Sequence, residues 1–135
     1  MPLAIDASIA FKWFVAEADS EAALSLLDSD DALWAPDLLL TEVGNALWAR
    51  LRSLPNGEAV TQEALVRLPR IFTSIAPAQE LIARAAKIAF EIDHPIYDCV
   101  YLALVEREKI ELITADARLQ RNVRGTRFET MVRTP

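Results

Sequence analysis

The stretch LAIDAS, Leu3 to Ser8, is a short apolar run that ends on a carboxylate, Asp6, with small residues directly behind it. A strand with only a structural role in the core would not be expected to end on a charged residue, because the burial of an unpaired carboxylate costs free energy. The stretch therefore predicts a strand, Leu3–Ile5, that delivers Asp6 to a site. A second interpretation stays open, in which Asp6 is the N-cap of a short helix over Ser8–Phe14.

Beyond this stretch, apolar pieces of strand length alternate with longer helical stretches, a pattern typical of a parallel sheet covered by helices. Further strands are predicted near Ala32–Ala35, Thr73–Ala76 and Glu111–Thr114, with an edge strand over Phe128–Val132. Helices are predicted over Asp19–Asp28, from Pro36 to about Ser53, over Glu58–Phe72 with a kink or an end at Pro69, from Pro77 to about Ile92, over Ile96–Glu108 and over Ala117–Asn122. No linker or repeat divides the chain, so we expect one α/β domain over residues 1–135 with a central, mostly parallel sheet.

The composition is that of a globular protein with a core of its own. The chain has 135 residues, 53% of them hydrophobic and 25% charged, and a formal net charge of −6. This charge disfavours a polyanionic partner, unless the acids are neutralised by bound cations. The single cysteine, Cys99, excludes an intramolecular disulfide and is expected in the core. No stretch is long enough to span a bilayer, and no basic region precedes the first apolar residues, so we expect a cytoplasmic protein.

Four carboxylates lie at strand ends or on inward helix faces, where burial of an unpaired charge would cost free energy. Asp116 follows the fourth predicted strand as Asp6 follows the first, and ligands of open parallel sheets bind outside such strand ends. Glu42 shares a mostly apolar helix face with Asn45, and Asp98 lies in the first turn of a helix that is apolar almost all round. A shared divalent cation would stabilise all four, and oxygen ligands suit Mg²⁺ or Mn²⁺.

Each of these acids also has an alternative role. Asp116, like Asp6, can cap the helix that follows it, and Asp98 can complement the positive end of its own helix. Glu42 can form a salt bridge with a distant arginine. Taken one at a time these roles suffice, and it is the conjunction of the four acids that points to a metal.

Other kinds of catalytic site find little support. Ser8 and Thr114 lie two residues from Asp6 and Asp116, where they can orient a carboxylate or a water, or simply cap a helix. His94 is the only histidine and falls in a proline-containing turn, which disfavours a histidine-dependent triad or a multi-histidine zinc site. The sequence has no GxSxG, Walker A or GxGxxG motif.

Four segments in order resemble the motifs of PIN-domain ribonucleases, specifically the VapC-type toxins of toxin–antitoxin pairs. They are IDAS with KWF behind it (Ile5–Ser8 and Lys12–Phe14), PDLLLTEVGNALW (Pro36–Trp48), YDCVYLALVE (Tyr97–Glu106) and ITADARL (Ile113–Leu119). The resemblance covers nearly the whole chain and is thinnest between Ser53 and Pro77. It implies a three-layer α/β/α domain that cleaves RNA with Mg²⁺ or Mn²⁺.

The resemblance also implies a role for individual residues. It implies an acidic cluster that binds metal and is catalytic, formed by Asp6, Glu42, Asp98 and Asp116, with support from Thr114 and from Ser8 and Asn45. In a two-metal scheme, one ion activates the attacking water and the other stabilises the leaving oxygen. A cognate antitoxin and a homodimer are implied as well, and the three tryptophans, Trp13, Trp34 and Trp48, fit additional hydrophobic surface.

Two rival functions stay open at this point. The first is a non-catalytic PIN-like module that binds RNA or protein, against which the complete set of acids argues. The second is an aspartyl-phosphate receiver or phosphatase, which would place another acid beside or two residues after the first, where this chain has Ser8.

Basic residues gather near the end of the chain and offer contacts for an RNA backbone. They are Arg118, Arg121, Arg124 and Arg127, followed by Arg133, and Lys12 lies close to Asp6. A solvated surface with cations near a helix C-terminus explains the arginines equally well.

Overall fold

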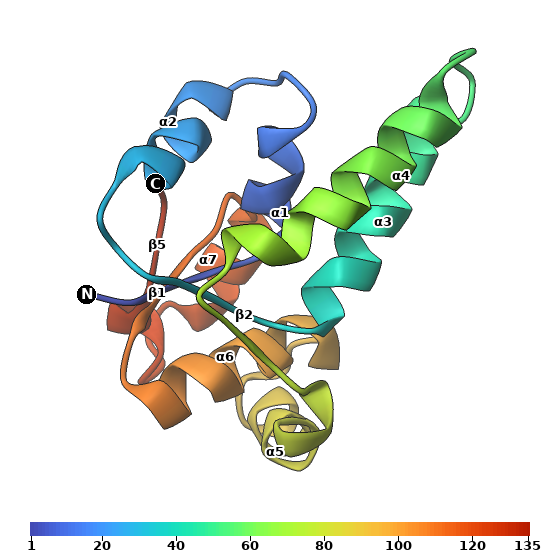
Figure 1. The fold of residues 1–135 in the computed structure, drawn as a ribbon. Coiled ribbons are helices and arrows are strands. Elements are labelled where there is room, and N and C mark those ends of the chain that lie inside the picture. The colour runs from blue at the N-terminus through green and yellow to red at the C-terminus, as the bar shows by residue number, and fades with distance from the viewer.

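The computed structural model describes all residues 1–135, and at its centre is a five-stranded parallel sheet (Figure 1). The strands lie in the order β3-β2-β1-β4-β5, and every neighbouring pair is parallel. Their bounds are β1 Leu3–Ile5, β2 Leu33–Pro36, β3 Ser74–Ala76, β4 Glu111–Ile113 and β5 Val132–Arg133. The predicted α/β fold with a central, mostly parallel sheet is confirmed, and the sheet is parallel throughout.

Helices cover both faces of this sheet, which gives the three layers of the expected fold. Helices α1 and α2 lie on one side of the sheet and α5 and α6 on the other (Figure 1). The helices are α1 Ala7–Ala10, α2 Ser20–Ser25, α3 Leu38–Leu51, α4 Gly57–Arg67, α5 Ile82–Ile92, α6 Ile96–Glu108 and α7 Ala117–Val123. Short 3₁₀ turns are η1 Phe11–Trp13, η2 Leu26–Asp28, η3 Leu68–Ile71, η4 Ala78–Glu80 and η5 Glu129–Met131. No helix is both long and apolar enough to cross a membrane.

The order of the strands places a crevice between β1 and β4. The chain leaves β1 for β2 and β3 on one side and then crosses to β4 and β5 on the other. Strand order therefore reverses at β1 and β4, the position where open parallel sheets bind their ligands. Asp6 directly follows β1 and Thr114 directly follows β4, and the Asp6 amide donates to the Ile113 carbonyl at 3.3 Å.

Helix α6 is the buried centre of the molecule. Every residue from Cys99 to Val105 is buried, as expected for a helix that is apolar on all sides, and α6 packs against β1, β2 and β4. Cys99 is therefore the core thiol that the sequence predicts. The first turn is less buried, since Tyr97 is 62% exposed and the side chain of Asp98 keeps 23% of its surface exposed.

The structure corrects several predicted boundaries. The first helix begins at Ala7 and tightens into a 3₁₀ turn after Ala10, and α2 likewise ends in a 3₁₀ turn. The edge strand is only Val132–Arg133, because the preceding residues of the predicted strand form a 3₁₀ turn. At Pro69 the α4 helix has ended and a 3₁₀ turn has begun, since proline has no N–H to continue the ladder.

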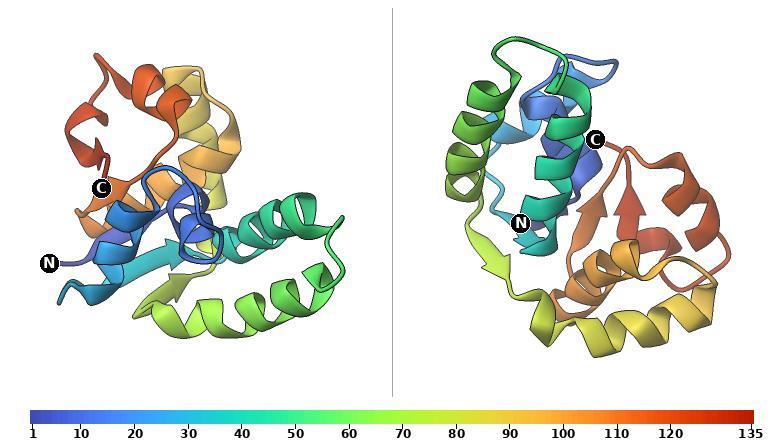
Figure 2. Two further views of the ribbon diagram at one scale, coloured as in Figure 1. Left: turned by 90° about the horizontal axis from the view of Figure 1, so that it is seen from above. Right: turned by 90° about the vertical axis from the view of Figure 1, so that its right-hand side faces the viewer.

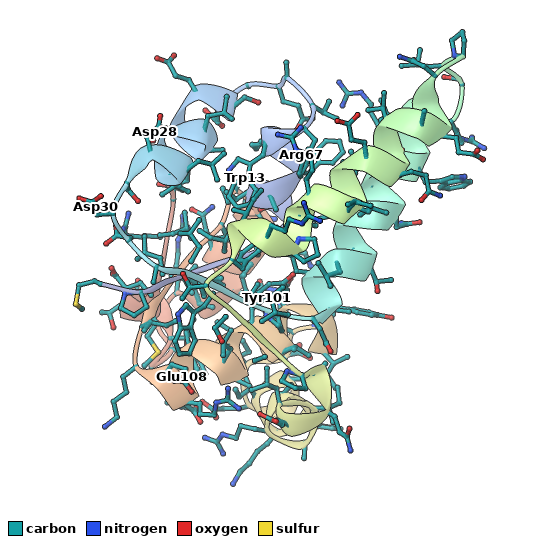
Figure 3. The ribbon with its side chains drawn as sticks, viewed as in Figure 1. Trp13, Asp28, Asp30, Arg67, Tyr101 and Glu108 are labelled. Atoms are coloured by element: carbon teal, nitrogen blue, oxygen red, sulfur yellow. The ribbon has the colours of Figure 1, made fainter.

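Helices α3 and α4 form a hairpin that projects away from the sheet (Figures 1 and 2). The hairpin is closed tightly at Gly57, where an added Cβ would lie 1.9 Å from the Leu51 carbonyl oxygen. Trp48 lies on its surface, 55% exposed, with the Arg52 guanidinium over its ring. Trp13 and Tyr101 instead point into the body of the domain (Figure 3), where Trp13 packs beside Phe72 at a ring separation of 5.8 Å.

Candidate active site

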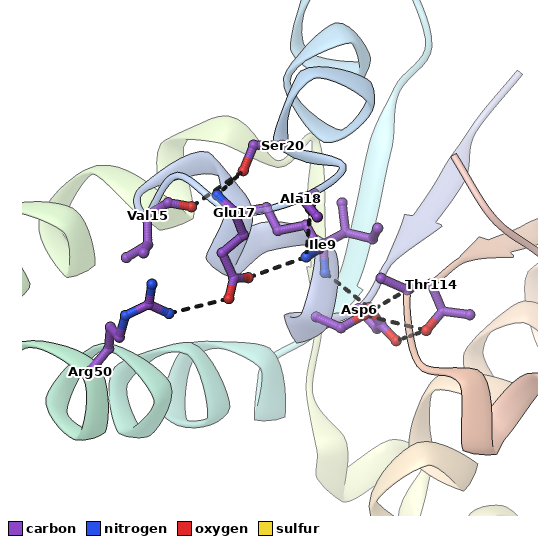
Figure 4. Close-up of polar contacts among 11 residues, drawn as sticks. Asp6, Ile9, Val15, Glu17, Ala18, Ser20, Arg50 and Thr114 are labelled. Atoms are coloured by element: carbon purple, nitrogen blue, oxygen red, sulfur yellow. Dashed lines mark hydrogen bonds and ion pairs between the residues drawn. The ribbon is translucent and has the colours of Figure 1, made fainter.

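Asp6 is the most deeply buried of the four predicted acids. Its carboxylate accepts hydrogen bonds from the Ser8 hydroxyl at 2.5 Å, from the Thr114 hydroxyl and from the Ile9 amide at 3.3 Å (Figure 4). The Ile9 bond makes Asp6 the N-cap of α1, so the capping role proposed for it is real. The two hydroxyl bonds come from different segments and hold both carboxylate oxygens at the crevice.

Burial changes the acidity of Asp6. Removal from water raises the pKa of Asp6 from 3.8 to about 7, although the hydrogen bonds from Ser8, Thr114 and Ile9 favour the charged form. The negative charge of Asp98 raises it further. A carboxylate that accepts three hydrogen bonds and still resists ionisation lacks a positive counter-charge.

Glu42 is linked to the same region through Tyr101. The Tyr101 hydroxyl donates to Glu42 Oε1 at 2.7 Å, and Tyr101 itself is only 1% exposed. Burial raises the pKa of Glu42, the Tyr101 bond lowers it, and the charge of Asp98 raises it again. Sequence reasoning missed Tyr101, although it lies three residues after Asp98 and so on the same side of α6.

The expected inward face of α3 needs a correction. The buried stripe of this helix is Leu39, Val43 and Leu47, with Glu42 half-buried beside it and Asn45 exposed. Glu42 and Asn45 therefore look into an open groove and not into the core. The groove has a volume of about 480 Å³, and Ser8, Lys12 and Glu17 also line it.

Asp98 is held by the histidine that the sequence placed in a turn. His94 does lie between α5 and α6, but its side chain is fully buried and its Nε2 is 2.6 Å from Asp98 Oδ2. On the other edge of the ring, the Asn122 side-chain nitrogen lies 2.8 Å from Nδ1. The four-residue spacing of His94 and Asp98 was a usable signal for the first contact, whereas nothing local pointed to Asn122.

Asp116 caps α7, as its alternative role requires. Its carboxylate accepts from the amides of Arg118 at 2.9 Å and Leu119 at 3.3 Å. Its own amide donates to the Thr114 hydroxyl at 3.0 Å, so a single hydroxyl joins the segments of Asp6 and Asp116. The predicted supporting role of Thr114 thus has a clear geometric basis.

None of the four acids of the acidic cluster forms an ion pair with a lysine or arginine. Lys12, which lines the groove, and Arg50 both bind Glu17 at 3.2 Å (Figure 4). These pairings also lower the pKa of Glu17. The contact of Lys12 with phosphate stays a prediction.

The donor atoms suit a hard divalent cation. No three histidine, cysteine, aspartate or glutamate side chains converge closely enough to hold one ion by themselves. Mg²⁺ does not require this, since it keeps several waters and is held by one or two carboxylates in many sites. The carboxylates of Asp6, Glu42 and Asp98, whose charges all act on Tyr101, have oxygen atoms of the kind that such an ion binds.

The five C-terminal arginines divide into two groups. Arg127 binds Glu91 and Glu106, and Arg133 binds Glu111. The other three are exposed, form no ion pair and follow directly behind Asp116; they are Arg118, Arg121 and Arg124.

Comparison with known proteins places this arrangement in context. A model of the PIN domain matches residues 3–125. Ribonuclease VapC3 of Pyrobaculum aerophilum is 30% identical over 121 residues, which cover 88% of this chain and 92% of that protein.

Solved structures share the fold at lower identity. The sarcin-ricin loop cleaving toxin VapC20 of Mycobacterium tuberculosis has a TM-score of 0.71 at 17% identity, covering 85% of this chain and 90% of that one. PAE2754 of Pyrobaculum aerophilum has a TM-score of 0.68 at 22% identity, with coverage of 93% and 82%. VapBC2 of Rickettsia felis, bound to a DNA fragment from its promoter, has a TM-score of 0.66 at 11% identity, with coverage of 100% and 99%.

Proposed function

The chain belongs to the PIN domain family, in its VapC ribonuclease group, and from this premise we propose that it is a Mg²⁺- or Mn²⁺-dependent endoribonuclease that acts as a toxin. The single observation that carries the proposal is a set of carboxylates without a lysine or arginine partner at the switch point of the sheet, with Asp6 buried and the other three partly buried. Asp6, Glu42 and Asp98 all contribute to raising the pKa of Tyr101 well above its ordinary value, after burial, which is the largest cause. The charges of these three acids act on one phenol, and a shared divalent cation would stabilise them together.

The acidic cluster would hold the ions, with Asp6, Glu42, Asp98 and Asp116 as ligands. When bound, two divalent ions lower the pKa of the attacking water and stabilise the leaving oxygen of an in-line displacement at phosphorus. Ser8 and Thr114 fix both oxygens of Asp6, and Tyr101 fixes one oxygen of Glu42. These hydroxyls pre-orient the carboxylates, so that little reorganisation is needed on binding.

Neutralisation of the acids also removes the electrostatic objection to an RNA substrate. Two divalent ions offset four carboxylates, and the groove then no longer repels phosphate. Arg118, Arg121 and Arg124 are exposed beside Asp116 and would contact the RNA backbone. Asn45, exposed at the groove edge, would support a water or a sugar hydroxyl.

The partners follow from the same family membership. We infer a cytoplasmic protein that forms a homodimer and is inhibited by a cognate antitoxin, whose apolar helix would cover the groove and whose basic side chain would reach the acids. The VapBC2 complex of Rickettsia felis is a solved neighbour of the same fold. A non-catalytic RNA- or protein-binding module is the alternative, and the intact acid set argues against it.

The test is cleavage of a structured RNA by the purified chain in Mg²⁺ or Mn²⁺, with EDTA as the comparison. We expect cleavage with metal, none in excess EDTA, and none from the Asp6→Asn and Asp98→Asn variants. Asp28→Asn and Glu63→Gln remove exposed acids far from the groove and serve as matched controls that keep activity. Full activity in EDTA or in both site variants would contradict the proposal.

A further inference from the structure

His94 lies in a turn, yet its side chain is buried and its backbone is hydrogen-bonded on both sides. Its side chain is fully buried, its amide donates to the Ala89 carbonyl at 3.2 Å, and its carbonyl accepts from the Cys99 thiol at 3.7 Å. Pro95 follows it and is the N-cap residue of α6. Backbone hydrogen bonds therefore hold His94 in place, in addition to the contacts that its ring nitrogens make.

The two ring nitrogens have partners of different kinds. Nδ1 lies 2.8 Å from the side-chain nitrogen of Asn122, an amide donor. Nε2 lies 2.6 Å from Asp98 Oδ2, to which a ring N–H donates. The arrangement Asn122–His94–Asp98 thus anchors one edge of the ring on α7 and directs the other edge at Asp98.

The contact from His94 occupies only one oxygen of Asp98. It fixes the rotamer of the carboxylate and leaves the other oxygen available to a divalent ion. Hydrogen-bonded outer partners of this kind commonly orient metal-ligating carboxylates.

We propose that His94, held by Asn122 with Nε2 directed at Asp98, is a positioning residue that orients Asp98 for a divalent cation. The proposal rests on the proposed function, in which Asp98 is a metal ligand. It adds a second layer of residues, from the α5–α6 turn and from α7, that none of the acidic motifs contains. Asn122 lies one turn after Arg118 on α7. The same short helix therefore carries both the partner of His94 and one of the exposed arginines.

The first experiment measures the tautomer directly. His94 is the only histidine in the chain, so a long-range ¹H–¹⁵N spectrum of protein purified without a histidine tag reports on this ring alone. We expect a proton on Nε2, and a changed ring signal in Asn122→Asp, whose carboxylate requires a proton on Nδ1. A ring without a proton on Nε2 in the native protein would overturn the proposal, because it could not donate to Asp98.

The second experiment measures Mn²⁺ binding without RNA, by the loss of the free Mn²⁺ signal in electron paramagnetic resonance. We expect His94→Leu to weaken binding by about 10–100-fold, the usual effect of losing an outer partner. His94→Gln should retain most of the affinity, because its amide nitrogen can still donate to Asp98. Arg84→Gln breaks a different contact between α5 and α6, the pair with Glu106 at 2.6 Å, and should bind Mn²⁺ like the native chain.

The outcomes separate the two proposals. Native affinity in His94→Leu, with Mn²⁺ binding intact, overturns the positioning role and leaves the proposed function standing. Failure of the native chain to bind Mn²⁺ overturns both. If His94→Leu does not fold, the tautomer of the native ring still decides the question.

Discussion

Replacement of Asp6 by asparagine should stabilise the protein while abolishing its activity. The substitution keeps the shape of the side chain and removes the charge that burial disfavours. Asp6 has a folded-state pKa of about 7 against an ordinary value of 3.8. Each pH unit between these values corresponds to about 1.4 kcal/mol, so the buried charge costs about 4 kcal/mol once it is fully ionised.

The pH dependence gives the prediction its sign. Below pH 3.8 the carboxyl is protonated in both the folded and the unfolded chain, and it contributes nothing to the pH dependence. Between pH 3.8 and about 7 the unfolded chain releases a proton that the folded chain keeps, so the free energy of unfolding falls as the pH rises. Above about pH 7 the loss is complete and constant.

The assay is urea unfolding in EDTA at several pH values between 4 and 8.5. We expect the free energy of unfolding of Asp6→Asn to exceed that of the native chain by about 2–4 kcal/mol at pH 8.5. The lower value applies if the amide pairs poorly with both hydroxyls, at about 1 kcal/mol for each bond. The difference should shrink toward zero near pH 4. Asp28→Asn, an exposed acid in η2, is the control and should change little at any pH. An Asp6→Asn variant that is less stable than the native chain at pH 8.5 would refute the reasoning.

Three further predictions follow from single contacts. Tyr101→Phe removes the donor to Glu42 and so raises the pKa of Glu42 further. In a pH–rate profile, RNA cleavage should fall about tenfold on the acidic side and recover as the pH rises; an unchanged profile would show that the bond is not used. Arg121→Gln should reduce the slope of the logarithm of the RNA-binding constant against the logarithm of the salt concentration by about 0.7. Arg133→Gln, which changes a paired arginine, should leave this slope unchanged. Equal slopes in the two variants would exclude the exposed arginines as phosphate contacts. Gly57→Ala should lower the free energy of unfolding in urea by about 1–3 kcal/mol, because the new Cβ would lie 1.9 Å from a backbone carbonyl oxygen. A free energy of unfolding equal to that of the native chain would contradict the tight turn.

The sequence was sufficient for the sheet and for the positions of its two strand-end acids. Short apolar runs bounded by turns and longer periodic stretches are local signals, and the carboxyl ends of parallel strands meet at one edge whatever the exact register. Asp6 and Asp116 could therefore be placed before the fold was known. Their capping bonds could also be anticipated, since these are made to amides only two or three residues away.

The remaining parts of the site depend on contacts that no local pattern encodes. Tyr101 and Glu42 are 59 residues apart, and His94 and Asn122 are 28 apart. From the sequence alone, Tyr101 looks like one more core residue of α6. Its hydroxyl can donate to Glu42 only because α3 packs beside it. Glu42 was expected on a buried face because its helix neighbours are apolar, yet the packing of α3 leaves that face along an open groove. Tertiary packing decided both cases.

The most direct test of the central claim is the chemistry of the RNA ends produced by the purified chain in Mg²⁺. Water activated within an acidic cluster attacks phosphorus itself, so the account predicts one product end with a phosphate monoester and the other with a free hydroxyl, and no cyclic intermediate. These products should disappear in EDTA and in Asp98→Asn. Ends that carry a 2′,3′-cyclic phosphate, or cleavage that persists in EDTA, would show that the RNA 2′-hydroxyl is the nucleophile and would contradict a metal-dependent role for the four carboxylates.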